Sequence, residues 1–154
     1  MTISNVNAVY FSATYTTRKV VRTIAGQQQG KVSEYDITQK ALEEDIILDQ
    51  NDLLIVGMPV YAGRIPTNAV SDLNKFKGNN TPVIIVCVYG NRDYDDALLE
   101  MKDIVTANGF KVISAGAFIA CHSIFPAVGE GRPDDLDISL IREFANKSVE
   151  RLAT

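Results

Sequence analysis

A hydroxyl-rich loop near the N-terminus is the first stretch whose residue types suggest chemistry. Four of the six residues at 12–17 are Ser or Thr, and Val20 and Ile24 then recur at helical spacing. A helix start presents unpaired N–H groups and a partial positive charge, which suit a phosphate. The simpler interpretation is helix capping by Ser12 or Thr14. The loop lacks the glycine pattern of a dinucleotide fingerprint and the Gly-Lys-Ser/Thr of a P-loop, so it is neither of those sites.

Two later loops carry tyrosines and, like the hydroxyl-rich loop, each follows an apolar run that predicts a strand. Tyr61 follows the apolar run at 52–57, and Tyr89 and Tyr94 follow the apolar run at 83–88. Ligands of parallel α/β sheets bind beyond the carboxyl ends of the strands, where the strand order reverses. We therefore expect the tyrosines to lie near the hydroxyl loop. A phosphate cradle beside aromatic rings suits a planar aromatic phosphate ester, and flavin mononucleotide (FMN) is such a molecule.

The elements that would position these loops alternate between strands and helices. Apolar and alternating runs predict five strands, at about 6–11, 31–37, 52–57, 83–88 and 112–120. Helical spacing and capping signals predict helices at about 16–28, 67–76, 96–108 and 136–152, with a short or irregular helical connection at 38–50. This alternation predicts a single α/β domain over residues 1–154, with a five-stranded parallel sheet and helices on both faces.

Composition narrows the classes of function. The chain has 154 residues, 46% apolar and 22% charged, with a net charge of −4 and no run of like charges. These values disfavour nucleic acid and anionic membranes as partners. No apolar run reaches membrane-spanning length and no signal-peptide pattern is present, so we expect a cytoplasmic protein. Cys87 and Cys121 lie in or beside apolar runs and are expected to be ordinary buried thiols; with a single histidine they predict no metal site.

Together, the three loops resemble those of the flavodoxin family. Ser12-Ala13-Thr14-Tyr15-Thr16-Thr17 resembles its phosphate loop, Ser/Thr-x-Thr-Gly-x-Thr. Pro59-Val60-Tyr61-Ala62-Gly63 resembles the loop whose aromatic residue flanks one face of the isoalloxazine, and Tyr89-Gly90-Asn91-Arg92-Asp93-Tyr94 resembles Gly-Asp-x-x-Tyr, whose tyrosine stacks on the other face. The resemblance spans nearly the full chain. The run from Tyr89 to Leu99, with the later His122-Ser123 and Gly131-Arg132-Pro133, looks closer still to the flavodoxin-like module that some anaerobes fuse to a two-cluster ferredoxin.

The resemblance implies the strand order 2-1-3-4-5, non-covalently bound FMN and a set of cofactor-binding residues spread over the three loops. The first loop would contribute Ser12, Ala13, Thr14, Tyr15, Thr16 and Thr17, the second Pro59, Val60, Tyr61, Ala62, Gly63 and Arg64, and the third Tyr89, Gly90, Asn91, Arg92, Tyr94 and Asp95. In this arrangement Tyr94 stacks on the flavin, Tyr61 flanks its other face, and Arg64 and Arg92 are candidates for its pyrimidine edge.

Three positions depart from the family's pattern. Tyr15 stands where the phosphate loop usually has glycine, Asn91 replaces the usual aspartate, and Ala62 lies about where many flavodoxins keep a glycine. Because a bulky residue disfavours positive φ, we expect a differently shaped phosphate loop or a Tyr15 side chain that covers the phosphate. Asn91 removes one negative charge near the flavin.

The resulting hypothesis is an electron-transfer flavoprotein that shuttles electrons between redox partner proteins, such as a ferredoxin or a ferredoxin-linked reductase. The chemistry would belong to the cofactor, so no catalytic side chain is predicted. The alternative is an NAD(P)H-dependent FMN or quinone oxidoreductase of the same fold, although no second nucleotide motif is seen. A phosphorylated receiver domain is disfavoured because Ser12-Ala13 and Gly57-Met58 stand where that fold keeps its acidic residues.

Overall fold

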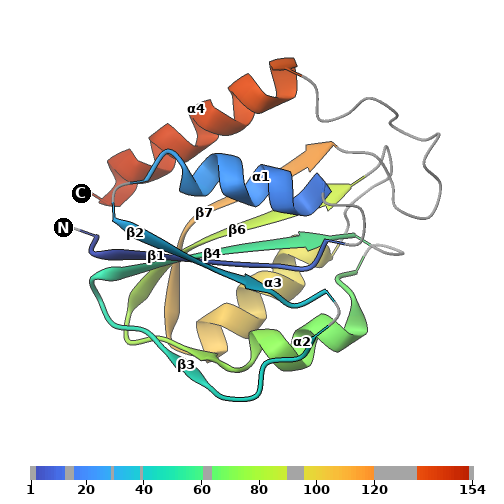
Figure 1. The fold of residues 1–154 in the computed structure, drawn as a ribbon, viewed down its shortest axis with the longest axis vertical. Helices are drawn as coiled ribbons and strands as arrows, with labels where there is room; N and C mark the ends of the chain where they lie inside the picture. The colour runs from blue at the N-terminus through green and yellow to red at the C-terminus, as the bar shows by residue number, and fades with distance from the viewer. Residues whose placement is uncertain are drawn as a thin grey trace.

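Five parallel strands form the central sheet of the computed structural model, in the order β2-β1-β4-β6-β7 (Figure 1). Their bounds are β1 (Asn5–Tyr10), β2 (Lys31–Asp36), β4 (Asp52–Pro59), β6 (Thr81–Tyr89) and β7 (Phe110–Ile119). Counted without the short strands β3 and β5, this is the predicted order 2-1-3-4-5, so the predicted sheet is confirmed. The structure describes residues 3–12, 16–28, 30–38, 40–60, 64–89, 96–119 and 135–152.

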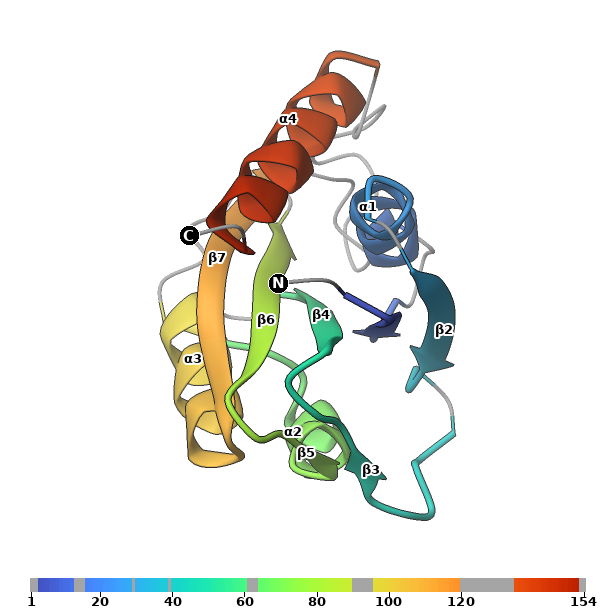
Figure 2. The ribbon, with the colours of Figure 1, turned by 90° about the vertical axis from the view of Figure 1, so that its left-hand side faces the viewer.

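Four helices cover the two faces of this sheet (Figure 2). One face packs against α1 (Thr16–Ala25) and α4 (Asp135–Leu152), and the other against α2 (Thr67–Leu73) and α3 (Ala97–Ala107). The helices at 16 and 136 were therefore predicted to within a few residues, although α1 ends before the predicted position near Gln28. No helix in the described ranges is long and apolar enough to cross a membrane.

Strands β4 and β6 are buried on both faces, which explains their unbroken apolar sequences. Successive side chains of β4 point to opposite faces of the sheet and therefore pack in two different hydrophobic cores. Leu53 and Ile55 pack in the core under α1 and α4, whereas Leu54 and Val56 pack in the core under α2 and α3. Each fully buried aliphatic side chain contributes roughly 1.5–3 kcal/mol. The two-sided core therefore fixes β4 and β6, and with them the ends from which their loops leave.

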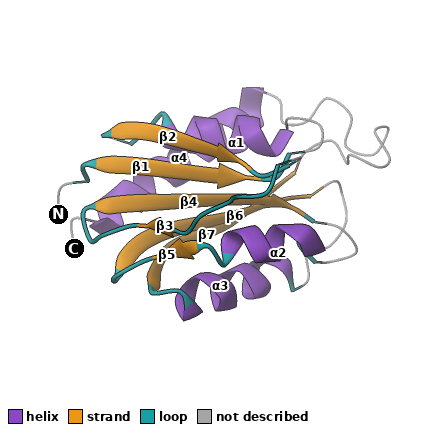
Figure 3. Cartoon of the chain, turned by 60° about the horizontal axis from the view of Figure 1, so that its bottom comes forward, coloured by secondary structure: helices purple, strands orange, loops and turns teal. Residues whose placement is uncertain are grey.

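A second sheet of two short parallel strands lies beside α2 (Figure 3). It pairs β3 (Ile46–Ile47) with β5 (Phe76–Lys77). The prediction of a helical connection at 38–50 is wrong for this segment, and the helix predicted to reach Phe76 ends at Leu73. Phe76 is fully buried and packs edge-on against Tyr35, with ring centroids 5.3 Å apart. This tertiary packing draws Phe76 out of the helix and into a strand.

Candidate functional site

The loops at 12–17, 59–64 and 89–95 all leave from one edge of the main sheet, because β1 pairs with β4 and β4 pairs with β6 in parallel. The pairing continues just past the strand ends. The N–H of Phe11 donates to the carbonyl of Gly57 at 3.2 Å, and the N–H of Val60 donates to the carbonyl of Val88 at 3.2 Å. The strand ends from which the three predicted loops leave therefore lie side by side.

Several predicted site residues lie outside the described residues. They are Ala13, Thr14, Tyr15, Tyr61, Ala62, Gly63, Gly90, Asn91, Arg92, Tyr94 and Asp95. Their roles stay predictions. Ser12, Thr16, Thr17, Pro59, Val60, Arg64 and Tyr89 are described, and they lie at the strand ends or at the start of α1 and α2.

Ser12 connects the end of β1 to the first turn of α1. Its side chain is buried, with 5% of the residue exposed. Its hydroxyl oxygen accepts a hydrogen bond from the N–H of Arg18 at 3.1 Å, although α1 begins only at Thr16. This contact satisfies one of the N–H groups that a helix start leaves unpaired, although Ser12 lies four residues before Thr16 and is therefore not the N-cap itself.

Gly57 lets α1 lie directly on the sheet. A Cβ atom at this position would come within 2.1 Å of Val21 Cγ2 and 3.2 Å of Thr17 Cγ2. Thr17 is almost fully buried, with 1% exposed, and its methyl group faces this gap. The absent side chain of Gly57 therefore sets how close the N-terminal turns of α1 come to the carboxyl ends of β1 and β4. A helix start at that place is suited to hold an anion.

The far end of the second loop is fixed by an ion pair that the sequence did not predict. Arg64 Nε donates to Glu100 Oε1 at 3.1 Å, and Arg64 Nη2 pairs with Glu100 Oε2 at 2.6 Å. The N–H of Ile65 also donates to Glu100 Oε1 at 3.1 Å. Hydrogen bonding from Arg64 holds the pKa of Glu100 below its ordinary value. Nothing local in the sequence signals this pair, because Glu100 belongs to α3.

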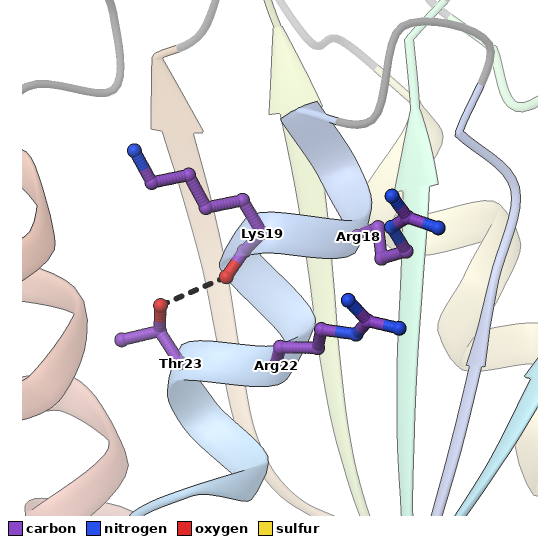
Figure 4. Close-up of a pocket in the computed structure, with 4 residues that line it drawn as sticks. All are labelled: Arg18, Lys19, Arg22 and Thr23. Atoms are coloured by element: carbon purple, nitrogen blue, oxygen red, sulfur yellow. Dashed lines mark hydrogen bonds between the residues drawn. The ribbon is translucent and has the colours of Figure 1, made fainter.

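Basic residues line the outer side of α1 in an otherwise acidic chain. Arg18, Lys19 and Arg22, together with Thr23, line a shallow hollow of about 410 Å³ (Figure 4). Arg18 and Arg22 project to the same side of the helix, whereas Lys19 projects to the other side. Since α1 contains no acidic residue, the charges of Arg18 and Lys19 near its start add to the positive end of its dipole and favour an anion there, whereas Arg22 lies in the last turn.

Arg22 is held in place by the neighbouring strand. Its Nε lies 3.0 Å from both carboxylate oxygens of Glu34, and Tyr10 donates its hydroxyl proton to Glu34 Oε1 at 3.0 Å. Burial, followed by this hydrogen bond to Glu34, raises the pKa of Tyr10. The cluster ties α1 to β1 and β2 close to the end of β1, and it keeps the Tyr10 phenol neutral.

No family model and no curated protein matches the sequence. Solved structures do match it. A flavodoxin from the domain Archaea shares 12% identity with a TM-score of 0.63, covering 97% of this chain and 99% of that chain. The Fusobacterium nucleatum flavodoxin bound to flavin mononucleotide shares 16% identity with a TM-score of 0.66, covering 96% and 98%. Rubredoxin oxygen:oxidoreductase from Desulfovibrio gigas shares 15% identity with a TM-score of 0.58, covering 99% of this chain but 38% of that chain. This protein has the flavodoxin-like fold.

Proposed function

We propose that this protein binds FMN without a covalent bond and transfers electrons between redox partner proteins. The observation that carries the proposal is the start of α1, which Gly57 brings onto the sheet edge where the three loops leave. The structural likeness to a flavodoxin solved with flavin mononucleotide supports the same assignment. Bound FMN would supply the redox chemistry itself, so the chain's own residues bind, orient and shield it.

The start of α1 fits a phosphate ester. The proposed phosphate-binding residues are Ser12, Ala13, Thr14, Tyr15, Thr16 and Thr17. Hydroxyl and N–H donors here would make charge-assisted hydrogen bonds, each worth roughly 1.5–3 kcal/mol. The positive charges of Arg18 and Lys19 near the start of the same helix add an attraction that acts at longer range, whereas the charge of Arg22 is paired with Glu34.

The second and third loops are proposed to hold the ring. Tyr61 and Tyr94 would stack on its two faces, while Pro59, Val60, Ala62, Gly63, Arg64, Tyr89, Gly90, Asn91, Arg92 and Asp95 would form its surroundings. The ion pair of Arg64 with Glu100 supports this by anchoring the loop that carries Tyr61 to α3. Aromatic faces are suited to a neutral planar ring.

FMN binding is tested by titrating the apoprotein with FMN and, separately, with riboflavin. The expected result is saturable binding of FMN with quenched flavin fluorescence, and an affinity for riboflavin lower by about two orders of magnitude or more, since several phosphate contacts are lost. Folded protein that shows no saturable uptake of FMN contradicts the proposed cofactor. Equal affinities for the two flavins contradict the phosphate site.

The electron-carrier role is tested with the FMN-loaded protein. We expect it to accept electrons from a reduced ferredoxin or a ferredoxin-linked reductase, and to oxidise neither NADH nor NADPH on its own. Steady turnover of either nicotinamide with a quinone acceptor would instead support an NAD(P)H-dependent oxidoreductase. The two activities are separated by following flavin absorbance and nicotinamide absorbance in the same reaction.

A further inference from the structure

The backbone of Ser12 is held by a side chain that follows β2. The N–H of Ser12 donates to Thr38 Oγ1 at 2.8 Å, across 26 residues of sequence. Thr38 reaches this place because Asp36 pairs with Tyr10 at the end of β1, and the N–H of Ile37 donates to the Tyr10 carbonyl at 3.0 Å. Ile37 is buried in the core, with 2% exposed. The segment after β2 is therefore firmly placed beside the start of the phosphate loop.

Asp36 decides which way the Thr38 hydroxyl points. Its Oδ1 atom accepts the hydroxyl proton of Thr38 at 2.5 Å and the N–H of Thr38 at 3.0 Å. A hydroxyl has a single proton to donate and two lone pairs. Once that proton is given to Asp36, the lone pairs of Thr38 Oγ1 are left to accept from Ser12. The chain of bonds runs from Ser12 through Thr38 to a carboxylate, an arrangement in which each bond strengthens the next.

The same serine then orients the helix start. Because its N–H is used by Thr38 and its oxygen accepts from the N–H of Arg18, Ser12 joins the segment after β2 to the first turn of α1. The Ser12 N–H is consequently committed to Thr38 and is not among the backbone donors offered to an anion. Its hydroxyl can still donate one proton while it accepts from Arg18.

We propose that Thr38 and Asp36 are positioning residues of the phosphate site. This inference rests on the proposed function and deepens it. Asp36 orients Thr38, Thr38 holds Ser12, and Ser12 orients the start of α1, where the phosphate is proposed to bind. Neither Thr38 nor Asp36 was singled out in the sequence, since they lie outside the three loops that carry the resemblance.

The first test replaces Thr38 with Val or with Ser. Thr38→Val keeps the shape but leaves the buried Ser12 N–H without an acceptor, so we expect FMN to bind about tenfold more weakly or worse. Riboflavin affinity is expected to change less than about twofold, because riboflavin has no phosphate, and Thr38→Ser is expected to restore FMN affinity. The matched control is Thr23→Val, whose hydroxyl donates to the Lys19 carbonyl further along α1; it should bind FMN like the wild type.

The second test asks whether Asp36 acts through Thr38. Asp36→Ala is expected to weaken FMN in the same direction, and the double variant Asp36→Ala/Thr38→Val to bind no more weakly than Thr38→Val alone. Losses that simply add in the double variant would show that Asp36 acts independently and overturn its assignment. Equal loss of FMN and riboflavin in Thr38→Val would overturn a role specific to the phosphate, as would unchanged FMN affinity.

Amide hydrogen exchange keeps this inference separate from the proposed function. In the ligand-free protein, Thr38→Val is expected to speed exchange of the Ser12 and Arg18 amides, while amides of β6 stay protected. If the wild type binds no FMN, the proposed function fails, and the exchange rates still decide whether Thr38 holds the loop. Unchanged exchange at Ser12 and Arg18 would overturn the inference whatever the flavin affinities.

Discussion

The guanidinium of Arg64 and the carboxylate of Glu100 form a two-point ion pair, with atoms 3.1 Å and 2.6 Å apart. The Glu100 side chain is only 16% exposed, whereas that of Arg64 is 58% exposed. Glu100 also accepts the N–H of Ile65. One carboxylate thus holds Arg64, the last residue of the second loop, and the adjacent Ile65 to α3, and its loss should loosen the segment that carries Tyr61.

Glu100→Gln should weaken the fold and the flavin site in a pH-dependent way. Because Arg64 lowers the pKa of Glu100 in the folded state, ionisation of Glu100 favours folding. Its contribution is present above the ordinary glutamate pKa of about 4.3 and is lost as the pH falls through the lower, folded value. We expect a loss of about 1 kcal/mol at pH 7, discounted for the exposed arginine, that shrinks as the pH falls through the lowered folded pKa of Glu100.

Urea unfolding of the two proteins at several pH values measures this difference. The control is Glu143→Gln, which breaks the exposed pair with Lys147 within α4 and should change stability by only a few tenths of a kcal/mol at any pH. A Glu100→Gln effect that stays constant between pH 7 and pH 3 would show that its charge is not what stabilises the loop.

Gly57→Ala should push α1 away from the sheet. The added methyl group would lie 2.1 Å from Val21 Cγ2, so the Val21 side chain or the helix that carries it must shift, at a cost of about 1–3 kcal/mol. FMN affinity should fall as well, since the start of α1 moves with the helix. Thermal melts and FMN titrations measure both effects.

A second substitution tests the cause of this loss. Val21→Ala removes the clashing methyl group, so Gly57→Ala/Val21→Ala should bind FMN more tightly than Gly57→Ala alone. If the double variant binds no better, the contact between Gly57 and Val21 does not set the position of the helix start.

Cys87 should be unreactive in the folded protein. It is fully buried in β6, as expected for an ordinary core thiol, and burial raises its pKa to about 12. Since the thiolate is the reactive form, alkylation at pH 8 should modify Cys87 only after unfolding in urea. Because the thiol ionises more readily in the unfolded chain, the free energy of unfolding falls as the pH rises from the ordinary cysteine pKa of about 8.5 toward the folded value of about 12.

Peptide mapping after alkylation checks this prediction and separates Cys87 from Cys121, which lies outside the described residues. The folded and unfolded protein are compared at the same pH and reagent concentration. Rapid labelling of Cys87 in the folded state would mean that β6 opens far more readily than its burial indicates.

Tyr94→Ala should change the redox behaviour of the bound flavin. A tyrosine ring stacks favourably on neutral oxidised flavin, but its negative face repels the anionic, fully reduced form. Stacking should therefore lower the potential of the step that forms the reduced anion, and the variant should bind oxidised FMN more weakly and show a higher potential for that step. If stacking favours oxidised over fully reduced FMN by about 1.4 kcal/mol, the two affinities differ tenfold.

Redox titration of both proteins measures the potential, and melting of the two apoproteins provides the control. If Tyr94 only packs at the start of α3, the variant will melt at a lower temperature while its FMN affinity and potential stay close to those of the wild type.

The amino-acid sequence by itself determined the main sheet. Strands buried on both faces need unbroken apolar runs, and the runs at 52–57 and 83–88 became β4 and β6. The helix predicted at about 96–108 became α3, and Gly109 follows it with a φ of +93°, a conformation that glycine adopts readily. The hydroxyl loop was also recognisable from the sequence, because Ser12 makes a short-range contact: its hydroxyl oxygen accepts from the N–H of Arg18 in the helix that begins a few residues later.

The tertiary structure alone decided which groups that are distant in the sequence meet. The pairing of Ile46 with Phe76, the ion pair of Arg64 with Glu100 and the bond from Ser12 to Thr38 each join residues from separate elements. Their energies depend on distance and orientation, and local periodicity carries no information about either quantity. The Thr38 hydroxyl comes within 2.8 Å of the Ser12 nitrogen because β1 and β2 lie side by side in the sheet. The Ser12 N–H thereby gains its hydrogen-bond acceptor.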